Sequence, residues 1–175
     1  MIARRRIETS AAVVAVISLA IWVGGLVALG ACAAPIVFHV VPAPLSGDAM
    51  GAVFRRFDAI AITSSVVVLA CEATRIRLDT SKVDEKDRAS LLAARTRTTL
   101  TVVAAAAAIY GGTRLSPRIV ALHVAGAVRG FGADGLELES LHRWAESVAK
   151  VEVTAGLVLL ALHITTLRRS PEKTA

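Results

Sequence analysis

The stretch that decides the fold is Thr9–Gly47, TSAAVVAVISLAIWVGGLVALGACAAPIVFHVVPAPLSG, which contains no Asp, Glu, Lys or Arg. Its 39 residues are well above the about 20 helical residues that cross a bilayer core of ~30 Å. We therefore predict a membrane-spanning helix over residues 11–34. Pro35, together with the prolines at 42 and 44, predicts a loop directly after that helix.

The composition of the whole chain agrees with a membrane protein. Of the 175 residues, 55% are hydrophobic and only 19% are charged, and the charged residues fall in blocks between long apolar runs. The mean hydropathy of +0.63 is high for a soluble domain. The net charge of +6 does not indicate nucleic-acid binding, because the basic residues lack the clustering and the interleaved aromatics of such a surface.

Three shorter windows without charged residues follow the first one. They are Ala59–Cys71, Thr98–Thr113 and Val153–Leu167. Flanking charged side chains can reach the membrane interfaces by snorkelling, so each window predicts a further span. The sequence thus predicts one domain over residues 1–175, with spans at about 11–34, 57–76, 96–113 and 148–167, an inner loop at 77–95 and an outer segment at 114–147.

The predicted fold class is an all-α integral membrane four-helix bundle with an additional outer helix before the last span. Ser116–Pro117 predicts the start of that helix, which would run to about Arg129. Asp134 with Glu137 resembles a capping box for a last helix from about Leu136. In the inner loop, the helix formers after Ser81 predict a short solvated helix.

The distribution of basic residues predicts the orientation in the membrane. The inner segments hold thirteen Lys and Arg residues and the outer segments six, which places both termini in the cytoplasm of a bacterial inner (plasma) membrane. Aromatic residues agree, since all but Trp22 are expected at or beyond the outer ends of spans. These outer aromatics are Phe38, Phe54, Phe57, Tyr110, Phe131 and Trp144.

Leu29–Cys32, L-G-A-C, resembles the cleavage site of a bacterial lipoprotein. A lipoprotein signal has an apolar core of about 7 to 15 residues, whereas the apolar run before Cys32 is longer and continues beyond it through Phe38. We therefore favour a retained helix. Cys32 and Cys71 are expected to be small buried residues, and they provide no disulfide framework.

Both ends of the chain resemble the membrane domain of unknown function typified by transmembrane protein 205. The amino-terminal motif consists of W-x-G-G, an apolar run, a Pro and an aromatic residue. After it, the stretch Gly47–Ala61 resembles the glycine-then-aromatic entry into the second helix of that family. W-x-G-G is also similar to bacterial copper-resistance membrane proteins. The resemblance implies a four-helix membrane bundle and no established activity, and it is carried by Trp22, Gly24, Gly25, Pro35, Phe38, Leu141, His142, Arg143, Ser147 and Gly156.

Polar side chains near the outer ends of the spans suggest a metal site. His39, Asp58, His142 and Glu146 combine imidazole and carboxylate groups, which suit a divalent metal such as zinc or copper. The alternative, which we favour, is that these groups lie at the interface and pair with one another or with neighbouring arginines. No haem is expected, because His163 has no histidine partner at its depth, and no nucleotide-binding motif is present.

Glu72 and His163 form a second candidate pair. At 1.5 Å per residue, Glu72 lies ~21 Å beyond Asp58 and His163 lies ~16 Å beyond Glu152, so both reach a similar depth. Facing each other, they could relay protons or hold a cation. We favour the alternative that Glu72 pairs with Arg75 or Arg77 instead.

Small residues in the first span favour close helix packing within the bundle, in a homo-oligomer or against another membrane protein. They are Gly24, Gly25, Ala28 and Gly30. No signature of an enzyme is present. We predict a non-enzymatic membrane protein linked to transport or tolerance of metals or small cations, embedded in lipid and binding no nucleic acid. The alternative is a structural or assembly subunit that packs through its Gly/Ala-rich helix faces.

Overall fold

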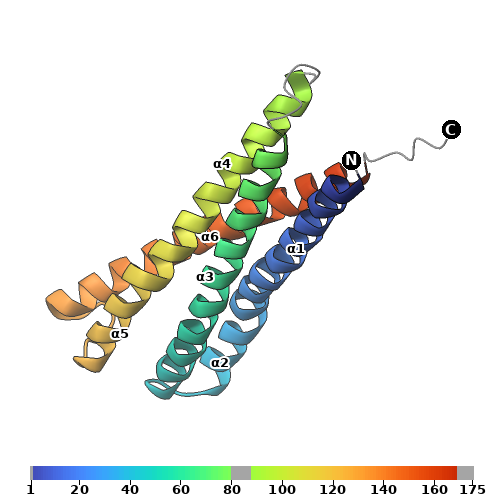
Figure 1. Ribbon diagram of the computed structural model, residues 1–175. Coiled ribbons are helices and arrows are strands. Elements are labelled where there is room, and N and C mark those ends of the chain that lie inside the picture. Colours follow the sequence, from blue (N-terminus) through green and yellow to red (C-terminus); the bar gives the residue numbers. More distant parts are fainter. Residues whose placement is uncertain (1, 80–87, 169–175) are drawn as a thin grey trace.

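The computed structural model describes residues 2–79 and 88–168, and within them all regular structure is helical (Figure 1). Four helices are long: α1 (Ile2–Val27), α3 (Leu45–Asp79), α4 (Arg88–Tyr110) and α6 (Gly132–Arg168). Two short helices prolong α1 and α4. They are α2 (Ala34–Val40) and α5 (Ser116–Val124), joined through the π-helical segments η1 (Ala28–Ala33) and η3 (Gly111–Leu115).

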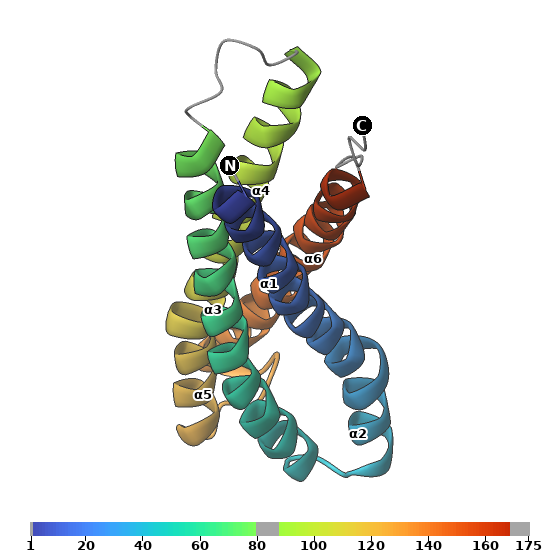
Figure 2. The same ribbon diagram turned by 45° about the vertical axis from the view of Figure 1, so that its right-hand side comes forward.

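Each long helix packs against two of the others. Both α1 and α4 contact α3 and α6. The start of α1, the end of α3, the start of α4 and the end of α6 lie at one end of the molecule, called here the α3–α4 end (Figures 1 and 2). The opposite end, called the α2–α5 end, carries α2, the start of α3, α5 and the start of α6.

The core is built from few large side chains and many small ones. Two glycines allow the helices to approach closely: a Cβ at Gly25 would overlap the Phe57 ring, and one at Gly156 would overlap Val23. Phe57 is therefore a core residue, and the prediction that it belongs to an outer aromatic belt is wrong. The buried cluster comprises Leu19, Trp22, Phe57, Ala61, Val68, Ala104, Ala108, Ala155 and Leu159.

Three helical stretches are long and apolar enough to cross a membrane: Arg6–Val40, Leu45–Leu78 and Gly132–Thr165. Large apolar side chains such as Ile17, Val66 and Leu157 face outward from these stretches, as expected where lipid replaces water. The prediction of an all-helical protein with membrane-spanning helices is confirmed to this extent: the described structure is helical, and three stretches could cross a membrane. α4 is not among the three, so a fourth span remains a prediction.

Pro35 behaves differently from its prediction, whereas Pro117 lies in the first turn of α5 as predicted. Pro35 does not begin a loop, because the helix continues to Val40 before the chain turns. A proline inside a helix lacks the N–H for the usual bond and clashes with the preceding turn, and a wider π turn ahead of it relieves that conflict. η1 ends two residues before Pro35 in this way, and η3 ends two residues before Pro117.

The outer segment also differs in its boundaries. α5 continues η3 without a new N-cap and ends at Val124, about five residues before the predicted end. The turn that follows contains Gly126 and Gly130, both with positive φ. α6 then begins at Gly132, and Glu137 binds Arg118 rather than completing a capping box.

Two further expectations are affected. Cys71 is buried as predicted, whereas Cys32 is exposed on η1 and the expectation of burial is wrong there. Of the inner loop, residues 80–87 lie outside the described part of the chain, and with them the predicted start of its helix after Ser81.

Candidate functional site

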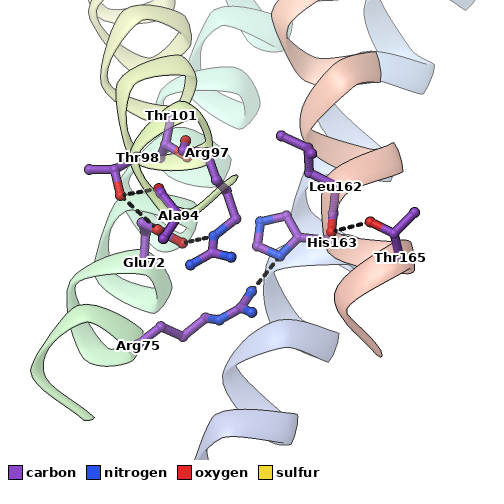
Figure 3. A network of polar contacts seen from close by, with 9 residues as sticks. All are labelled: Glu72, Arg75, Ala94, Arg97, Thr98, Thr101, Leu162, His163 and Thr165. Atoms are coloured by element: carbon purple, nitrogen blue, oxygen red, sulfur yellow. Dashed lines mark hydrogen bonds and ion pairs between the residues drawn. The ribbon is translucent and has the colours of Figure 1, made fainter. Parts of the chain in front are cut away.

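A cluster of charged and polar side chains lies among the helices toward the α3–α4 end (Figure 3). Its members, called the arginine cluster, are Glu72 and Arg75 from α3, Arg97 and Thr98 from α4, and His163 from α6. Glu72 is only 2% exposed and His163 is fully buried. Three helices are thus joined by polar contacts in the interior.

Glu72 is compensated by a buried arginine. Arg97 Nε donates to Glu72 Oε2 at 2.7 Å, and the Thr98 hydroxyl donates to Oε1 at 2.9 Å. A carboxylate with a charged donor and a hydroxyl donor can remain ionised in a buried position. This half of the arginine cluster therefore joins α3 to α4 by a charge-assisted pair.

His163 is held in one tautomer. Arg75 Nη1 lies 2.7 Å from His163 Nδ1. Because a guanidinium has donors and no acceptor, Nδ1 must accept, and the imidazole is neutral with its proton on Nε2. His163 consequently joins α6 to the same cluster without adding a second charge.

A second polar site lies toward the α2–α5 end and is called the two-acid site. It comprises Trp22, Asp58, Gly111, Gly112, Ser116 and Glu152, and it is centred on Glu152, whose side chain belongs to α6 and is 6% exposed. The indole Nε1 of Trp22 donates to Glu152 Oε2 at 2.9 Å, joining α1 to α6. No salt bridge to Glu152 occurs within the described residues.

The second carboxyl of this site belongs to Asp58 on α3. It lies near the Ser116 hydroxyl and within electrostatic range of Glu152. Between the two acids lies the start of η3: a Cβ at Gly112 would come within 3.2 Å of Asp58 Cβ, and one at Gly111 within 3.8 Å of Glu152 Oε1. A Gly-Gly π turn thus separates two carboxyls from different helices, and π turns of this kind often occur at functional sites.

A groove of about 540 Å³ opens beside Asp58, between α3 and the η3–α5 segment. Its walls are mainly apolar, and its charged members are Arg55 and Asp58. α3 and η3 approach closely in its lining, where a Cβ at Gly112 would lie 2.9 Å from Ile62 Cδ1. The groove is lined by Arg55, Asp58, Ala59, Ile62, Gly112, Ser116, Pro117, Val120 and Ala121.

The predicted metal ligands do not come together. His39 lies exposed on α2, and the His142 ring packs edge-on against His123 at 5.7 Å between centroids. Glu146 forms an exposed pair with Lys150 at 2.8 Å. No group of three or more His, Cys, Asp or Glu side chains suited to a metal occurs within residues 2–79 and 88–168. Asp58 alone of the four predicted ligands belongs to the two-acid site.

The predicted pair of Glu72 and His163 agrees with the structure better than the predicted metal site does. Glu72 and His163 do lie in one cluster at a common depth, but each contacts an arginine rather than the other (Figure 3). The favoured alternative named Arg75 or Arg77 for Glu72, whereas the ion pair is with Arg97 on α4.

The small residues of the first span divide into two sets. Gly25 packs inside the bundle on Phe57, whereas a Cβ at Gly24 or Gly30 would meet nothing within 4 Å. Ala28 is exposed on the same helix. The carboxy-terminal motif is also divided, since Gly156 packs on Val23 while Ser147 bonds only the carbonyl of Arg143 in its own helix.

Several site residues were not predicted as such. Trp22 appeared only as a motif residue and Ser116 only as a helix cap, while Arg97 counted only toward the orientation. The available signal for Trp22 was its isolation, since it is the one Trp inside a charge-free window. For Glu152, the signal was its place directly before the last such window.

The comparisons with known proteins identify a matching family model but no individual matching protein. The model of a domain of unknown function, DUF4149, matches residues 17–127, which include the amino-terminal motif from Trp22 to Phe38 and exclude the carboxy-terminal one. No curated protein and no solved structure matches the chain. The match supports a domain of unknown function and names neither transmembrane protein 205 nor copper resistance.

Proposed function

The chain belongs to the DUF4149 family, and we propose that it is a non-enzymatic membrane protein with four spans that exchanges small cations, above all protons, at the two-acid site. The proposal keeps the small-cation half of the sequence prediction. It omits a metal centre, because the described residues gather no ligand set for one.

The fourth span in this proposal is α4. It packs against α3 and α6, both of which contain stretches able to cross a membrane, so it must share their depth. Its residues Ala104, Ala105 and Ala108 are buried against these neighbours. With four spans, both ends of the chain lie on one side, and the excess of Lys and Arg there supports a cytoplasmic placement in a bacterial plasma membrane. Fusion of a periplasm-active reporter after Val128 is expected to be active, and one after Ile2 inactive.

The observation that carries the proposal is the environment of Glu152. A buried carboxylate without a cationic partner is costly, so burial favours the protonated, neutral carboxyl. A cation that reaches Glu152 would replace this proton, and Asp58 lies near enough to share its charge. Such an exchange is the elementary step of proton-coupled cation movement.

The arginine cluster supplies a second polar level. Glu72 lies 14 residues beyond Asp58 on α3, or ~21 Å along the helix. Between the two levels, the hydroxyls of Ser65 and Thr101 are buried among small residues. Ionisable groups at two depths are the arrangement that passage across a bilayer requires.

The test is proton flux through the purified protein in liposomes that contain a pH-sensitive dye. With a potential imposed by potassium and valinomycin, we expect the wild type to pass protons faster than protein-free liposomes. Glu152→Gln keeps the shape and the acceptor for Trp22 but removes the exchangeable proton, so flux should fall to background.

The matched control is Glu146→Gln, six residues earlier on the same helix, where the side chain is exposed and paired with Lys150. This variant should retain wild-type flux. Equal flux in wild-type and protein-free liposomes would contradict the proposal, as would full flux in Glu152→Gln.

A second candidate, an assembly subunit, is favoured by the open face of α1. Gly24 and Gly30 meet no neighbouring atom, and Cys32 is exposed farther along the same stretch. Small residues on an uncovered membrane helix permit close approach of a second helix. Oxidative cross-linking through Cys32 in membranes is expected to give a dimer that Gly24→Leu abolishes, with Cys71 as the buried internal control. A chain that stays monomeric under oxidation would count against self-association through this face.

A further inference from the structure

The groove beside Asp58 has the properties of a ligand site. Its volume of about 540 Å³ lies within the range of about 300–1,000 Å³ of small-molecule sites. Gly112 and Ile62 lie in close approach in its lining, and its charged lining side chains are Arg55 and Asp58. Most of its lining is apolar, with few polar groups to orient a ligand.

The acidic group that lines the groove is the Asp58 carboxyl. Asp58 is half-buried, and Ser116, which also lines the groove, lies close enough to interact with its carboxyl. A carboxylate offers four acceptor positions, so it has capacity left for a donor from a ligand. The donor that compensates its charge in an apolar surrounding is a cation able to form hydrogen bonds, such as an ammonium group.

Arg55 restricts which cations fit. It lies three residues before Asp58 on α3, and no ion pair joins these two described side chains. A guanidinium in the lining repels a second positive charge on the ligand. The part of the ligand near Arg55 must therefore be neutral, and the apolar walls at Ala59, Val120 and Ala121 favour a hydrocarbon.

We propose that this groove binds amphiphilic monoamines, with the ammonium group on Asp58 and the hydrocarbon part along α5. The inference rests on the proposed function, since it names the substrate class of the same site. The small cation is an organic ammonium bound at Asp58. Its charge displaces the proton held by Glu152, on the other side of Gly111–Gly112. No covalent step is involved, and one proton leaves for each monovalent cation that binds.

The experiment compares three probes with the same chain: 1-hexylamine, 1-hexanol and 1,6-diaminohexane. Binding to the purified full-length protein is measured by isothermal titration calorimetry, with protein-free micelles as the blank. We expect hexylamine to bind at least about tenfold more tightly than hexanol, because only the ammonium group forms a hydrogen bond between two charged groups with Asp58. The diamine should also bind more weakly than hexylamine, because of Arg55.

Two variants connect the binding to the named residues. Asp58→Asn should bind hexylamine no better than hexanol, and Arg55→Gln should recover binding of the diamine. The matched control is Asp48→Asn, an exposed acid ten residues earlier on α3, which should bind like the wild type. Circular dichroism melting curves establish that each variant is folded; if Asp58→Asn does not fold, Ser116→Ala replaces it, with weaker hexylamine binding expected.

Equal affinity for hexylamine and hexanol, or unchanged hexylamine binding in folded Asp58→Asn, would overturn the inference. Its failure is distinguishable from failure of the proposed function, since binding in detergent needs no flux and the flux assay contains no amine. Glu152→Gln separates them further: it should lose proton flux and still bind hexylamine.

Discussion

The two buried glutamates of the bundle are nearly equal in burial and opposite in their partners. Glu72 is 2% exposed and Glu152 is 6% exposed. Arg97 and Thr98 donate to Glu72, whereas a neutral indole donates to Glu152. Burial alone therefore does not determine what a carboxyl does in the membrane; the charge of its partner does. A paired carboxylate joins two helices, whereas one with a neutral donor is, in the proposed function, the group that keeps an exchangeable proton.

This difference predicts the largest effect for Glu72→Gln. The substitution leaves Arg97 as a buried charge without its counter-ion, so we expect a loss of about 3–5 kcal/mol in the free energy of unfolding. Unfolding of the purified protein in mixed micelles, followed by circular dichroism, measures it.

The control for that prediction removes both charges. Glu72→Met with Arg97→Met replaces the pair by apolar groups and should recover most of the lost stability, because exchange of a whole buried pair is often neutral. If Glu72→Gln unfolds like the wild type, Glu72 is not held as a carboxylate, and the contrast with Glu152 fails.

The second prediction concerns Trp22→Phe at the other glutamate. The variant keeps an aromatic ring but removes the indole N–H, leaving a buried acceptor without its donor. We expect a loss of about 1–3 kcal/mol, which is less than at Glu72 because no net charge is left unpaired. The same unfolding assay measures it, and a loss as large as that of Glu72→Gln would indicate that Glu152 is ionised.

A smaller effect is expected for Thr98→Val, which tests the second donor to Glu72. Thr98 donates to Glu72 Oε1, and its loss should cost about 1–2 kcal/mol because the acceptor carries charge. Thr101→Val is the matched control, since that buried hydroxyl bonds only the Arg97 carbonyl in its own helix at 2.9 Å. Equal melting temperatures of the two variants would show that Thr98 contributes no more than a local helix bond.

The sequence predicted the helices and the depth of polar groups better than it predicted their partners. Depth follows from the rise per residue, so Glu72 and His163 were placed correctly at one level. Partners depend on which helices are neighbours and on their rotation, and no spacing within α3 could indicate Arg97 on α4. The same limit explains the metal prediction, since His39 and His142 are both near span ends but on helices that do not meet there.

The helix ends show where local patterns were insufficient. Proline at 35 ordinarily ends a helix, and only the π turn before it allows the chain to continue. Ser116 has the features of an N-cap, yet the helix before it continues into α5 and its side chain lies near Asp58 on another helix. The π turn that leads into α5 without a new N-cap also brings Gly111 and Gly112 between the two acids.

The smallest effect is expected for Glu146→Gln, which extends the comparison to an exposed glutamate. Glu146 pairs with Lys150 at 2.8 Å, close to the 2.7 Å of the buried pair, but both side chains are exposed. Exposed pairs gain little because water or lipid headgroups solvate the separated charges. The melting temperature should equal that of the wild type at low and high salt. A clear drop for Glu146→Gln would mean that ion-pair geometry, rather than burial with a charged partner, distinguishes Glu72 from Glu152.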